Sequence, residues 1–372
     1  MAMTGPSKAL TVLHVDTERG WRGGERQALW LATALAARGH RSIIAGRTGE
    51  ALATRAAAAG VPVIGCDPWG GGELGLLAAA RLRASIVRHG VDVVHAHSGH
   101  AVTLGALATL GTRARLVVTR RVDFRLRANV GTRWKYSRAA AIIAISEAVA
   151  GALAASGIRR DRVTVIPSGI DLTRRVEPAS REMLTALGVP PTAPIVVQVA
   201  QLVGHKDPLT FVRAVAALHE LVPEAHAVMV GDGALAGSVA TAVREAGLDA
   251  VLHLAGYRTD ADRLIAAADV VTLSSREEGM GTVLLDAMAF GGAIAATTAG
   301  GIPEIVTDGD TGLLAPIGDG PRLGANIARL LTDHTLADRL RAGARRRVAD
   351  FSVEATTERT LDVYRRVLGS VP

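Results

Sequence analysis

Short β-branched runs alternate with longer stretches rich in Ala, Leu and Arg along most of the 372-residue chain. This alternation predicts parallel β-sheets with helices packed on both faces. The pattern occurs twice, on either side of a seam between Pro167 and Pro194 where prolines gather. One ordinary core does not suit a chain of this length, since domains usually hold about 100 to 200 residues. The expected fold is α/β, with two Rossmann-like, doubly wound parallel-sheet domains.

The strand candidates define where each domain begins and ends. In the first half they are residues 10–15, 42–45, 61–64, 91–95, 115–119, 141–145 and 163–166. In the second half they are residues 195–200, 226–230, 251–255, 270–273 and 293–296. We therefore predict a first domain over residues 1–171 and a second over residues 172–352. Residues 353–372 should form an amphipathic helix that crosses back to the first domain.

Composition excludes several protein classes. Mean hydropathy is +0.26, yet the apolar stretches 139–145 and 148–155 are interrupted well before the ~20 residues that a membrane span needs. No export signal is visible, because Asp16 follows the basic Lys8 too closely for an apolar core to fit between them. The single cysteine, Cys66, allows no internal disulfide. A cytoplasmic location is the expectation.

Positive charge is concentrated in one segment. The formal net charge is +7 and the sequence pI is about 10.4, which suits polyanionic partners. Residues 113–138 hold nine basic residues and one acidic residue, Asp123, with Phe124, Trp134 and Tyr136 interleaved. A solvated face and an acceptor-binding or anionic membrane surface are both compatible with this pattern, and we expect no nucleic-acid partner. The acceptor-side candidates are three arginines: Arg120, Arg121 and Arg125.

The strongest chemical signal is the segment 274–289, which follows the predicted strand 270–273. Gly279 and Gly281 allow the backbone to turn tightly and to approach a ligand. The helix that begins near Gly281 presents unpaired N–H groups to an anion, so a diphosphate suits this position. Glu278 precedes that helix and Asp286 lies inside it, about 10 Å apart at the rise of an α-helix. One carboxylate can address a sugar and the other a ribose.

This segment resembles the pattern EGxGxxxxEAMA of glycosyltransferase family 4. The match is carried by Glu278, Gly279 and Gly281 and by the run Ala287-Met288-Ala289, whereas Asp286 stands where the family has its second Glu. The resemblance implies a GT-B fold, in which two Rossmann-like domains face each other across a cleft. It also implies a retaining, metal-independent transfer from a nucleotide-diphosphate sugar, with no cofactor.

The resemblance extends over about residues 10–365 and implies roles for individual residues. The implied catalytic residues are His97, Lys206 and Glu278. A cation such as Lys206 is needed physically, since cleavage of the sugar–phosphate bond moves negative charge onto the leaving diphosphate. Gln201 stands where the family usually has Arg. The implied donor-binding residues are Gly23, Gly24, Gln201, Lys206, Tyr257, Arg258, Glu278, Gly279, Met280, Gly281, Thr282 and Asp286.

Other patterns favour structural roles. The segment 231–236 formally fits a dinucleotide fingerprint but lacks the acidic residue that should end the next strand. Asp260 and Asp262 suit a helix N-cap better than a metal site, so we predict no catalytic metal. His95, unlike His97, is expected to point to the other face of its strand and to be packed. Two alternative functions stay open: a nucleotide-sugar epimerase of similar fold and a non-catalytic sugar-nucleotide-binding protein.

Overall fold

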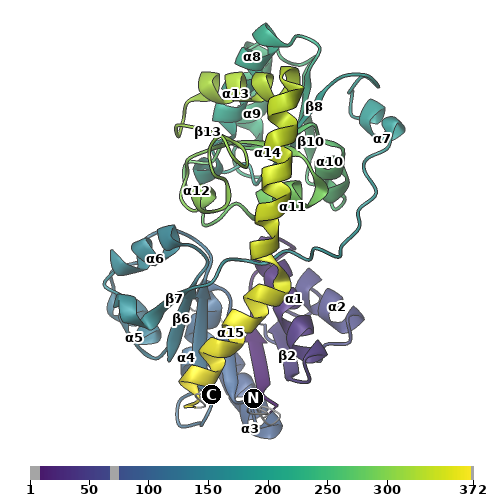
Figure 1. Ribbon diagram of the computed structural model, residues 1–372. Helices are drawn as coiled ribbons and strands as arrows, with labels where there is room; N and C mark the ends of the chain where they lie inside the picture. The colour runs from purple at the N-terminus through teal and green to yellow at the C-terminus, as the bar shows by residue number, and fades with distance from the viewer. Residues whose placement is uncertain (1–8, 68–74, 370–372) are drawn as a thin grey trace, which may run out of the picture. The chain divides into compact units, whose positions relative to one another are not determined.

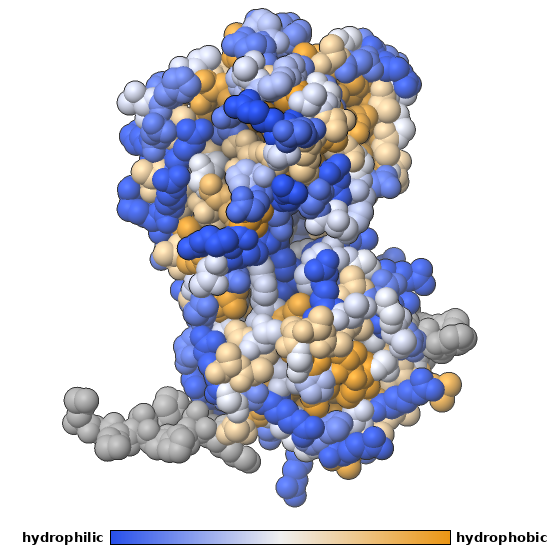
Figure 2. Space-filling model, turned by 90° about the vertical axis from the view of Figure 1, so that its right-hand side faces the viewer, coloured by the Kyte–Doolittle hydropathy of each residue, from blue (hydrophilic) through white to orange (hydrophobic). Residues whose placement is uncertain are grey.

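The protein divides into two compact units, residues 1–171 with 353–372 and residues 172–352. The structure is a computed structural model and describes residues 9–67 and 75–369 (Figure 1). Lys8, the basic residue expected to precede any export signal, lies outside the described residues. On the side drawn in Figure 2, hydrophilic side chains predominate and apolar ones are scattered over both units.

Unit 1, residues 1–171 and 353–372, is built on a parallel sheet with the order β3-β2-β1-β4-β5-β6-β7. Its strands are β1 (Thr11–Val15), β2 (Arg41–Gly46), β3 (Val63–Gly65), β4 (Val93–Ala96), β5 (Arg115–Arg120), β6 (Ala141–Ala144) and β7 (Val163–Val165). Its helices are α1 (Gly23–Ala37), α2 (Ala51–Ala58), α3 (Leu76–His89), α4 (Gly99–Ala108), α5 (Val130–Ser137), α6 (Glu147–Ala154) and α15 (Val353–Val367), with a 3₁₀ turn at Arg160–Arg162.

Helix α15 closes one face of the unit 1 sheet. Its residues Leu361, Val363 and Tyr364 are buried with Leu35 of α1 and with apolar residues of β1, β4, β5 and β6. Gly169, just before the end of unit 1's first segment, lies so close to the start of α15 that a Cβ there would be 2.9 Å from the Cα of Val353. The amphipathic pattern of the last helix therefore buries its apolar stripe in unit 1.

Unit 2, residues 172–352, is built on a second parallel sheet with the order β10-β9-β8-β11-β12-β13. Its strands are β8 (Ile195–Val199), β9 (His226–Val230), β10 (Leu252–Gly256), β11 (Val270–Leu273), β12 (Ala293–Thr297) and β13 (Leu313–Ala315). Its helices are α7 (Arg181–Ala186), α8 (Pro208–Leu221), α9 (Ala236–Glu245), α10 (Ala261–Ala267), α11 (Thr282–Phe290), α12 (Ile302–Ile305), α13 (Gly320–Thr332) and α14 (His334–Arg347), with 3₁₀ turns at Gly204–Lys206 and Val348–Phe351.

The predicted strands are found within one or two residues of their expected bounds, with one omission. Strand β13 was not predicted, because its Leu-Leu-Ala sequence lacks the β-branched residues that marked the equally short strands β3 and β7. It adds a sixth strand beside β12. Helices α8 and α13 cover one face of this sheet, and Gly324 lets their backbones approach closely, since a Cβ there would meet the Ala214 carbonyl oxygen.

Both sheets have a topological switch point, where the direction of winding reverses. In unit 1 it lies between β1 and β4, and in unit 2 between β8 and β11. Ligands of open α/β sheets bind outside the carboxyl ends of the strands at such points. The loops that follow these four strands therefore locate the candidate site residues of each unit.

Candidate functional site

In unit 2, the loops after β8 and β11 are bound to each other. The backbone N–H groups of Arg276 and Glu277 donate to the carbonyl oxygen of His205, at 2.9 and 3.1 Å. The Ser274 hydroxyl donates to the carbonyl oxygen of Asp207 at 2.9 Å. These hydrogen bonds join segments about 70 residues apart in sequence and so bring the two predicted site segments together at the switch point.

The result is an ion pair between Lys206 and Glu278, whose Nζ and Oε2 atoms are 2.5 Å apart. Both side chains are largely shielded, with 20% and 10% of their surface exposed. The same carboxylate oxygen accepts a hydrogen bond from the Ser275 hydroxyl at 3.2 Å. The Glu278 carbonyl oxygen accepts from the Gly301 N–H at 2.8 Å, so its backbone is fixed as well.

Asp207, beside Lys206, has a left-handed backbone with a φ of 42°. Its carboxylate accepts from the Thr210 N–H at 3.3 Å, which caps helix α8. The other oxygen accepts from the Thr210 hydroxyl at 2.5 Å and from Arg276 Nε at 2.7 Å. A non-glycine residue in this region stores strain that its surroundings must hold in place, and such residues gather at functional loops.

The glycines of the segment 231–236 serve a close backbone approach. A Cβ at Gly231 would lie 1.8 Å from the Ala200 carbonyl oxygen, and one at Gly233 would lie 2.5 Å from that of Leu202. Glycine is therefore required here because this turn packs on the loop after β8, the loop that carries Gln201 and Lys206. The resemblance to a dinucleotide fingerprint has this structural cause.

Helix α11 begins at Thr282, directly after Gly281, which has a φ of 81°. Glu278, Gly279 and Met280 precede this helix start and are buried. The structure thus places the predicted donor-binding glycines at a helix N-terminus.

Asp286 lies inside α11 and is only 1% exposed. Its carboxylate accepts from Arg174 at 2.9 Å. The same guanidinium donates to Asp262 at 2.6 Å. Sequence reasoning missed Arg174, since it lies in the proline-rich seam 112 residues away from Asp286. The only signal was its charge in a segment without a strand or helix pattern.

Arg258 is held by an acidic neighbour. Its Nε and one terminal nitrogen donate to the two oxygens of Asp260, each at 2.8 Å. Asp260 is the residue before α10, as expected for an N-cap, but its side chain makes no capping hydrogen bond. The capping prediction is therefore right in position and wrong in contact. Tyr257 is 63% exposed beside this pair.

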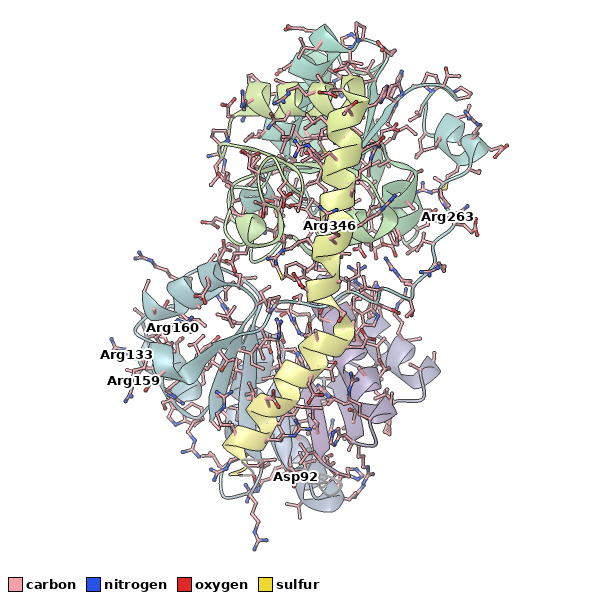
Figure 3. All side chains as sticks on the ribbon, in the orientation of Figure 1. Asp92, Arg133, Arg159, Arg160, Arg263 and Arg346 are labelled. Carbon is pink, nitrogen blue, oxygen red and sulfur yellow. The ribbon has the colours of Figure 1, made fainter. Side chains whose placement is uncertain are left out.

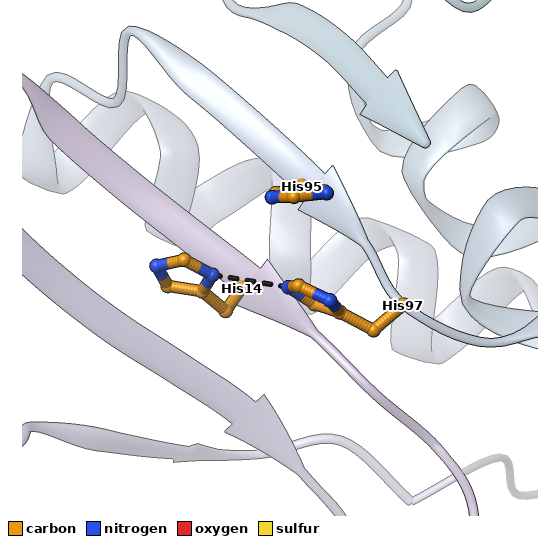
Figure 4. A group of neighbouring side chains, drawn as sticks. All are labelled: His14, His95 and His97. Carbon is orange, nitrogen blue, oxygen red and sulfur yellow. Dashed lines mark hydrogen bonds between the residues drawn. The ribbon is translucent and has the colours of Figure 1, made fainter. Parts of the chain in front are cut away.

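In unit 1, three histidines lie together at the carboxyl end of the sheet. His14 is in β1, His95 is in β4, and His97 follows β4 (Figure 4). The rings of His95 and His97 are 4.1 Å apart between centroids. His95 is buried as predicted, but its expected orientation is wrong, because residues two apart in a strand point to the same side.

A chain of hydrogen bonds joins this cluster to Arg121. One terminal guanidinium nitrogen of Arg121 is 3.1 Å from His97 Nδ1, and His97 Nε2 is 3.1 Å from His14 Nδ1. A guanidinium only donates, so His97 accepts at Nδ1 and donates from Nε2 to His14. Both ring nitrogens of His97 are thereby engaged with protein groups.

Burial keeps the three imidazoles neutral. It lowers the pKa of His14 to about 3. It holds the pKa of His95 and of His97 well below the usual value, with smaller contributions from the neighbouring rings and Arg121. Burial also lowers the pKa of Arg121 to about 10, against the opposing effect of the Asp16 and Glu25 carboxylates. At neutral pH the charge in this group belongs to Arg121 alone.

Among the described residues, this cluster is the one group of histidine, cysteine or acidic side chains with metal-ligand proximity, its ligand atoms lying within 4.8 Å of one another. His95 already contacts the Tyr364 and Thr119 hydroxyls, each at 2.6 Å. With the two nitrogens of His97 also engaged, a metal ion would have to displace several hydrogen bonds. The arrangement is that of a hydrogen-bonded network.

Of the other predicted residues of unit 1, some are held by contacts within the unit and one is exposed. Gly23 and Gly24 begin helix α1, and a Cβ at Gly24 would lie 3.5 Å from Cδ of Arg121. Arg120 donates to the carbonyl oxygens of Val122 and Phe124, at 3.1 and 2.9 Å, and so shapes its own loop.

Arg125, by contrast, is exposed. Helix α5 follows it, with the apolar Val130 83% and Trp134 36% exposed. Figure 3 shows Arg133 on the same side of unit 1 as Arg159 and Arg160, beside α5 and α6. An exposed surface of mixed basic and apolar side chains results.

Comparison with known proteins identifies the family. The model described as "Glycosyl transferases group 1" matches residues 180–347, and the model "Glycosyltransferase Family 4" matches residues 21–174. The α-maltose-1-phosphate synthase of Mycobacterium tuberculosis is 31% identical over 309 residues, which cover 74% of this chain and 79% of that protein. The chain belongs to glycosyltransferase family 4.

Other relatives of this family 4 glycosyltransferase are matched over less of their length. The lipopolysaccharide core biosynthesis glycosyltransferase LpsE of Rhizobium meliloti is 31% identical, over 50% of this chain and 53% of that protein. The chain thus spans about half the length of this curated relative. Among solved structures, Anabaena Alr3699/HepE in complex with UDP and glucose has a TM-score of 0.85 at 23% identity, covering 97% of this chain and 100% of that one. The fold is therefore GT-B.

No helix within residues 9–67 and 75–369 combines the length and the apolar character that crossing a bilayer requires. Sequence reasoning missed three residues that the structure places beside the predicted ones: Arg174 in unit 2 and, in unit 1, His14 and Asp16. The last two lie in the first strand and directly after it, where a buried polar residue in an otherwise apolar run was the available signal.

Proposed function

We propose that this glycosyltransferase moves a sugar from a nucleoside diphosphate sugar, held by unit 2, to a hydroxyl group of an acceptor held by unit 1. The observation that carries the proposal is the Lys206–Glu278 ion pair, 2.5 Å long, at the switch point of unit 2 and beside the start of α11. The bound UDP and glucose of Anabaena Alr3699/HepE, a protein of the same fold, favour a donor of this class.

The geometry suits stabilisation of a leaving diphosphate. Negative charge grows on the phosphate as the sugar–phosphate bond breaks, and a fixed ammonium together with helix N–H groups lowers the energy of that state. Without donor, Lys206 is neutralised by Glu278. When the donor binds, Lys206 turns to the phosphate and Glu278 to the sugar hydroxyls, so the two partners exchange an ion pair for substrate contacts.

Asp286 is assigned to the ribose with Arg174 as its support. The Asp side chain is one carbon shorter than the Glu typical of the family, and the Arg174 guanidinium at 2.9 Å sets its orientation. In this proposal Gln201 contacts the donor by hydrogen bonds and contributes no charge. Tyr257 and Arg258 line the base, with Arg258 oriented by Asp260.

We assign retention of configuration, with the leaving phosphate assisting deprotonation of the acceptor and no metal required. Proton NMR of the first product formed distinguishes an α- from a β-linkage. A product whose anomeric configuration is inverted relative to the donor would overturn this part of the proposal.

The acceptor is assigned as a glycan, of a lipid-linked or lipopolysaccharide type, in cell-envelope synthesis at the cytoplasmic side of a membrane. The exposed basic and apolar side chains around Arg125 and α5 support this, since such surfaces bind anionic lipids. The test is sedimentation with phosphatidylglycerol-containing vesicles, compared with pure phosphatidylcholine vesicles. Binding that is indifferent to the anionic lipid and to salt would contradict the membrane role.

Donor identity is tested by calorimetry with a panel of UDP-, GDP- and ADP-sugars. A donor at 100 times its dissociation constant should stabilise the folded protein by about 2.7 kcal/mol. Release of free nucleotide that depends on an acceptor separates transfer from the alternative of an epimerase. If a donor binds but the wild type and Lys206→Ala are equally inactive with every acceptor, the alternative of a non-catalytic binding protein is correct instead.

A further inference from the structure

Three residues of unit 1 converge on its switch point from neighbouring strands. Asp16 follows β1, His97 follows β4, and Arg121 follows β5, and these strands are adjacent in the sheet. The Asp16 N–H and the His97 N–H continue the strand hydrogen bonding, so the positions of both residues are fixed by the sheet. Their side chains lie where open α/β sheets bind ligands.

Arg121 is anchored by a neutral hydrogen-bond acceptor. Its hydrogen-bond acceptor is the neutral imidazole of His97, at 3.1 Å, and not a carboxylate. Its Nε is buried and has no hydrogen-bond partner among the described residues. Gly24 lies beside the same part of the side chain. A buried N–H donor without a partner at a switch point calls for an explanation, and a ligand that binds there would supply one.

Two nearby carboxylates, those of Asp16 and Glu25, partly balance the positive charge of Arg121. Asp16 is 3% exposed, accepts the Glu18 N–H at 3.0 Å, and interacts electrostatically with Arg121. Glu25, in the first turn of α1, accepts the Arg22 N–H at 2.8 Å and also acts on Arg121. Two carboxylates beside one guanidinium disfavour an anionic ligand. Fixed acceptors next to a fixed donor suit a hydroxyl group, which both donates and accepts.

We propose that Asp16 and Arg121 form a subsite that binds a hydroxyl group of the acceptor. The part of the acceptor that enters this subsite is an uncharged sugar or polyol. His97 and His14 are positioning residues for Arg121. The inference rests on the proposed function and deepens it. The acceptor hydroxyl accepts a hydrogen bond from Arg121 and donates one to the Asp16 carboxylate. Any negative charge on the acceptor belongs outside this subsite, at the exposed basic surface around α5.

The histidines act through their tautomer. Arg121 can donate to His97 Nδ1 only while the His97 proton is on Nε2, and His14 Nδ1 accepts that proton's hydrogen bond at 3.1 Å. His14→Asn keeps an acceptor at a similar position, whereas His14→Leu removes it. A merely structural role for His14 would make the two variants differ in stability alone.

The test measures binding of neutral polyols and of their charged counterparts to the full chain. The probes are methyl α-D-glucopyranoside and myo-inositol, each compared with its phosphate monoester, by saturation-transfer NMR with UDP present. We expect saturable binding of a neutral probe that weakens about tenfold or more in Asp16→Asn and Arg121→Met, as for loss of a hydrogen bond to a charged group. Glu18→Gln and Arg88→Met, which change exposed side chains of the same unit, should bind as the wild type does.

His14→Leu should weaken the neutral probe as Arg121→Met does, and His14→Asn should restore it. The proposal is wrong if neither neutral probe gives a saturable signal, if the phosphate monoesters bind better and Asp16→Asn strengthens them, or if His14→Asn and His14→Leu bind equally. UDP affinity, measured in parallel, tests the donor site of unit 2. If the wild type binds none of the UDP-, GDP- and ADP-sugars of the donor panel, the proposed function is wrong, whereas donor binding without polyol binding would overturn this inference alone.

Discussion

The two units use the same topology but hold their cations differently. At the switch point of unit 2, Lys206 is paired with Glu278 and Arg174 with Asp262 and Asp286. At the switch point of unit 1, Arg121 is held by the neutral ring of His97. In unit 2 the carboxylates are hydrogen-bonded directly to the cations, whereas in unit 1 the direct partner of Arg121 is a neutral imidazole, and Asp16 and Glu25 act on Arg121 electrostatically.

This difference separates two ways of preparing a site. In unit 2 an incoming diphosphate competes with Glu278 for Lys206, so donor binding has to rearrange an existing ion pair. In unit 1 the orientation of Arg121 is set before any ligand arrives, which lowers the ordering cost of binding. We infer that unit 2 changes its contacts on binding its substrate and that unit 1 is preorganised.

The largest effect should come from the ion pair of unit 2. Lys206→Met should lower kcat by about 10²- to 10³-fold, the loss typical of removing one charge-stabilising group. Glu278→Gln should also lower transfer, and Glu277→Gln, which changes the exposed neighbour, is its matched control. Steady-state transfer with the preferred donor gives the measurement. If Glu278→Gln and Glu277→Gln lower the rate of transfer equally, the pairing of Glu278 with Lys206 has no specific role in transfer.

A second comparison sets Arg174 against Arg121. Arg174→Met leaves a deeply buried Asp286 without this cation and should cost about 3 kcal/mol, as when one partner of a buried pair is removed. Arg121→Met leaves a neutral imidazole and should cost less. All four tryptophans precede residue 171, so tryptophan fluorescence follows the unfolding of unit 1 and calorimetry adds that of unit 2. A larger loss of stability for Arg121→Met than for Arg174→Met would show that the neutral partner of Arg121 does not make its removal less destabilising.

Acid should affect unit 1 through its histidines. Their folded-state pKa values are lowered, so the unfolded chain binds more protons below pH 6.5 and unit 1 loses stability as the pH falls towards about 3. Each histidine contributes a slope of up to about 1.4 kcal/mol per pH unit. Asp16 and Glu25, whose pKa values are raised by burial, act in the opposite direction.

The comparison of wild type with His14→Asn isolates the histidine effect. We measure the free energy of unfolding by urea, followed by tryptophan fluorescence, between pH 7 and pH 4. This free energy should fall less steeply with decreasing pH in His14→Asn than in the wild type, because the variant has one titrating histidine fewer. Identical slopes would mean that His14 is not held neutral in the folded protein. Unit 2 should show a weaker counterpart of this effect, because burial also lowers the pKa values of His226 and His253, although less strongly.

The architecture and much of the unit 2 site were predictable, because periodic strands and a contiguous Gly-rich motif are local signals. The residues of segment 274–289 alone predict its turn, the start of its helix and its functional carboxylate. The Arg174–Asp286 pair was not predictable, since its partners are 112 residues apart and only the fold brings them together.

Unit 1 was harder to predict for the same reason. His97 was identified from its place after a strand, but its partners His14 and Arg121 come from two other strands. The orientation of His95 was predictable, because residues two apart in an extended segment point to the same side. A site assembled from single residues on three strands leaves no motif in the sequence.

The smallest expected effect on stability concerns the turns in the loop after β1 of unit 1 and in the loop after β8 of unit 2. Unit 1 uses Gly20, with a φ of 83°, whereas unit 2 uses Asp207, with a φ of 42°. Asp207→Asn keeps the cap and tolerates the left-handed backbone, so it should cost about 1 kcal/mol or less, the value of the partly exposed pair with Arg276. Asp207→Ala loses the cap and keeps the strain, and should cost about 2 kcal/mol. Calorimetry of unit 2 measures both. If Asn costs as much as Ala, the charge of Asp207, through its ion pair with Arg276, and not its backbone conformation holds the turn beside Lys206.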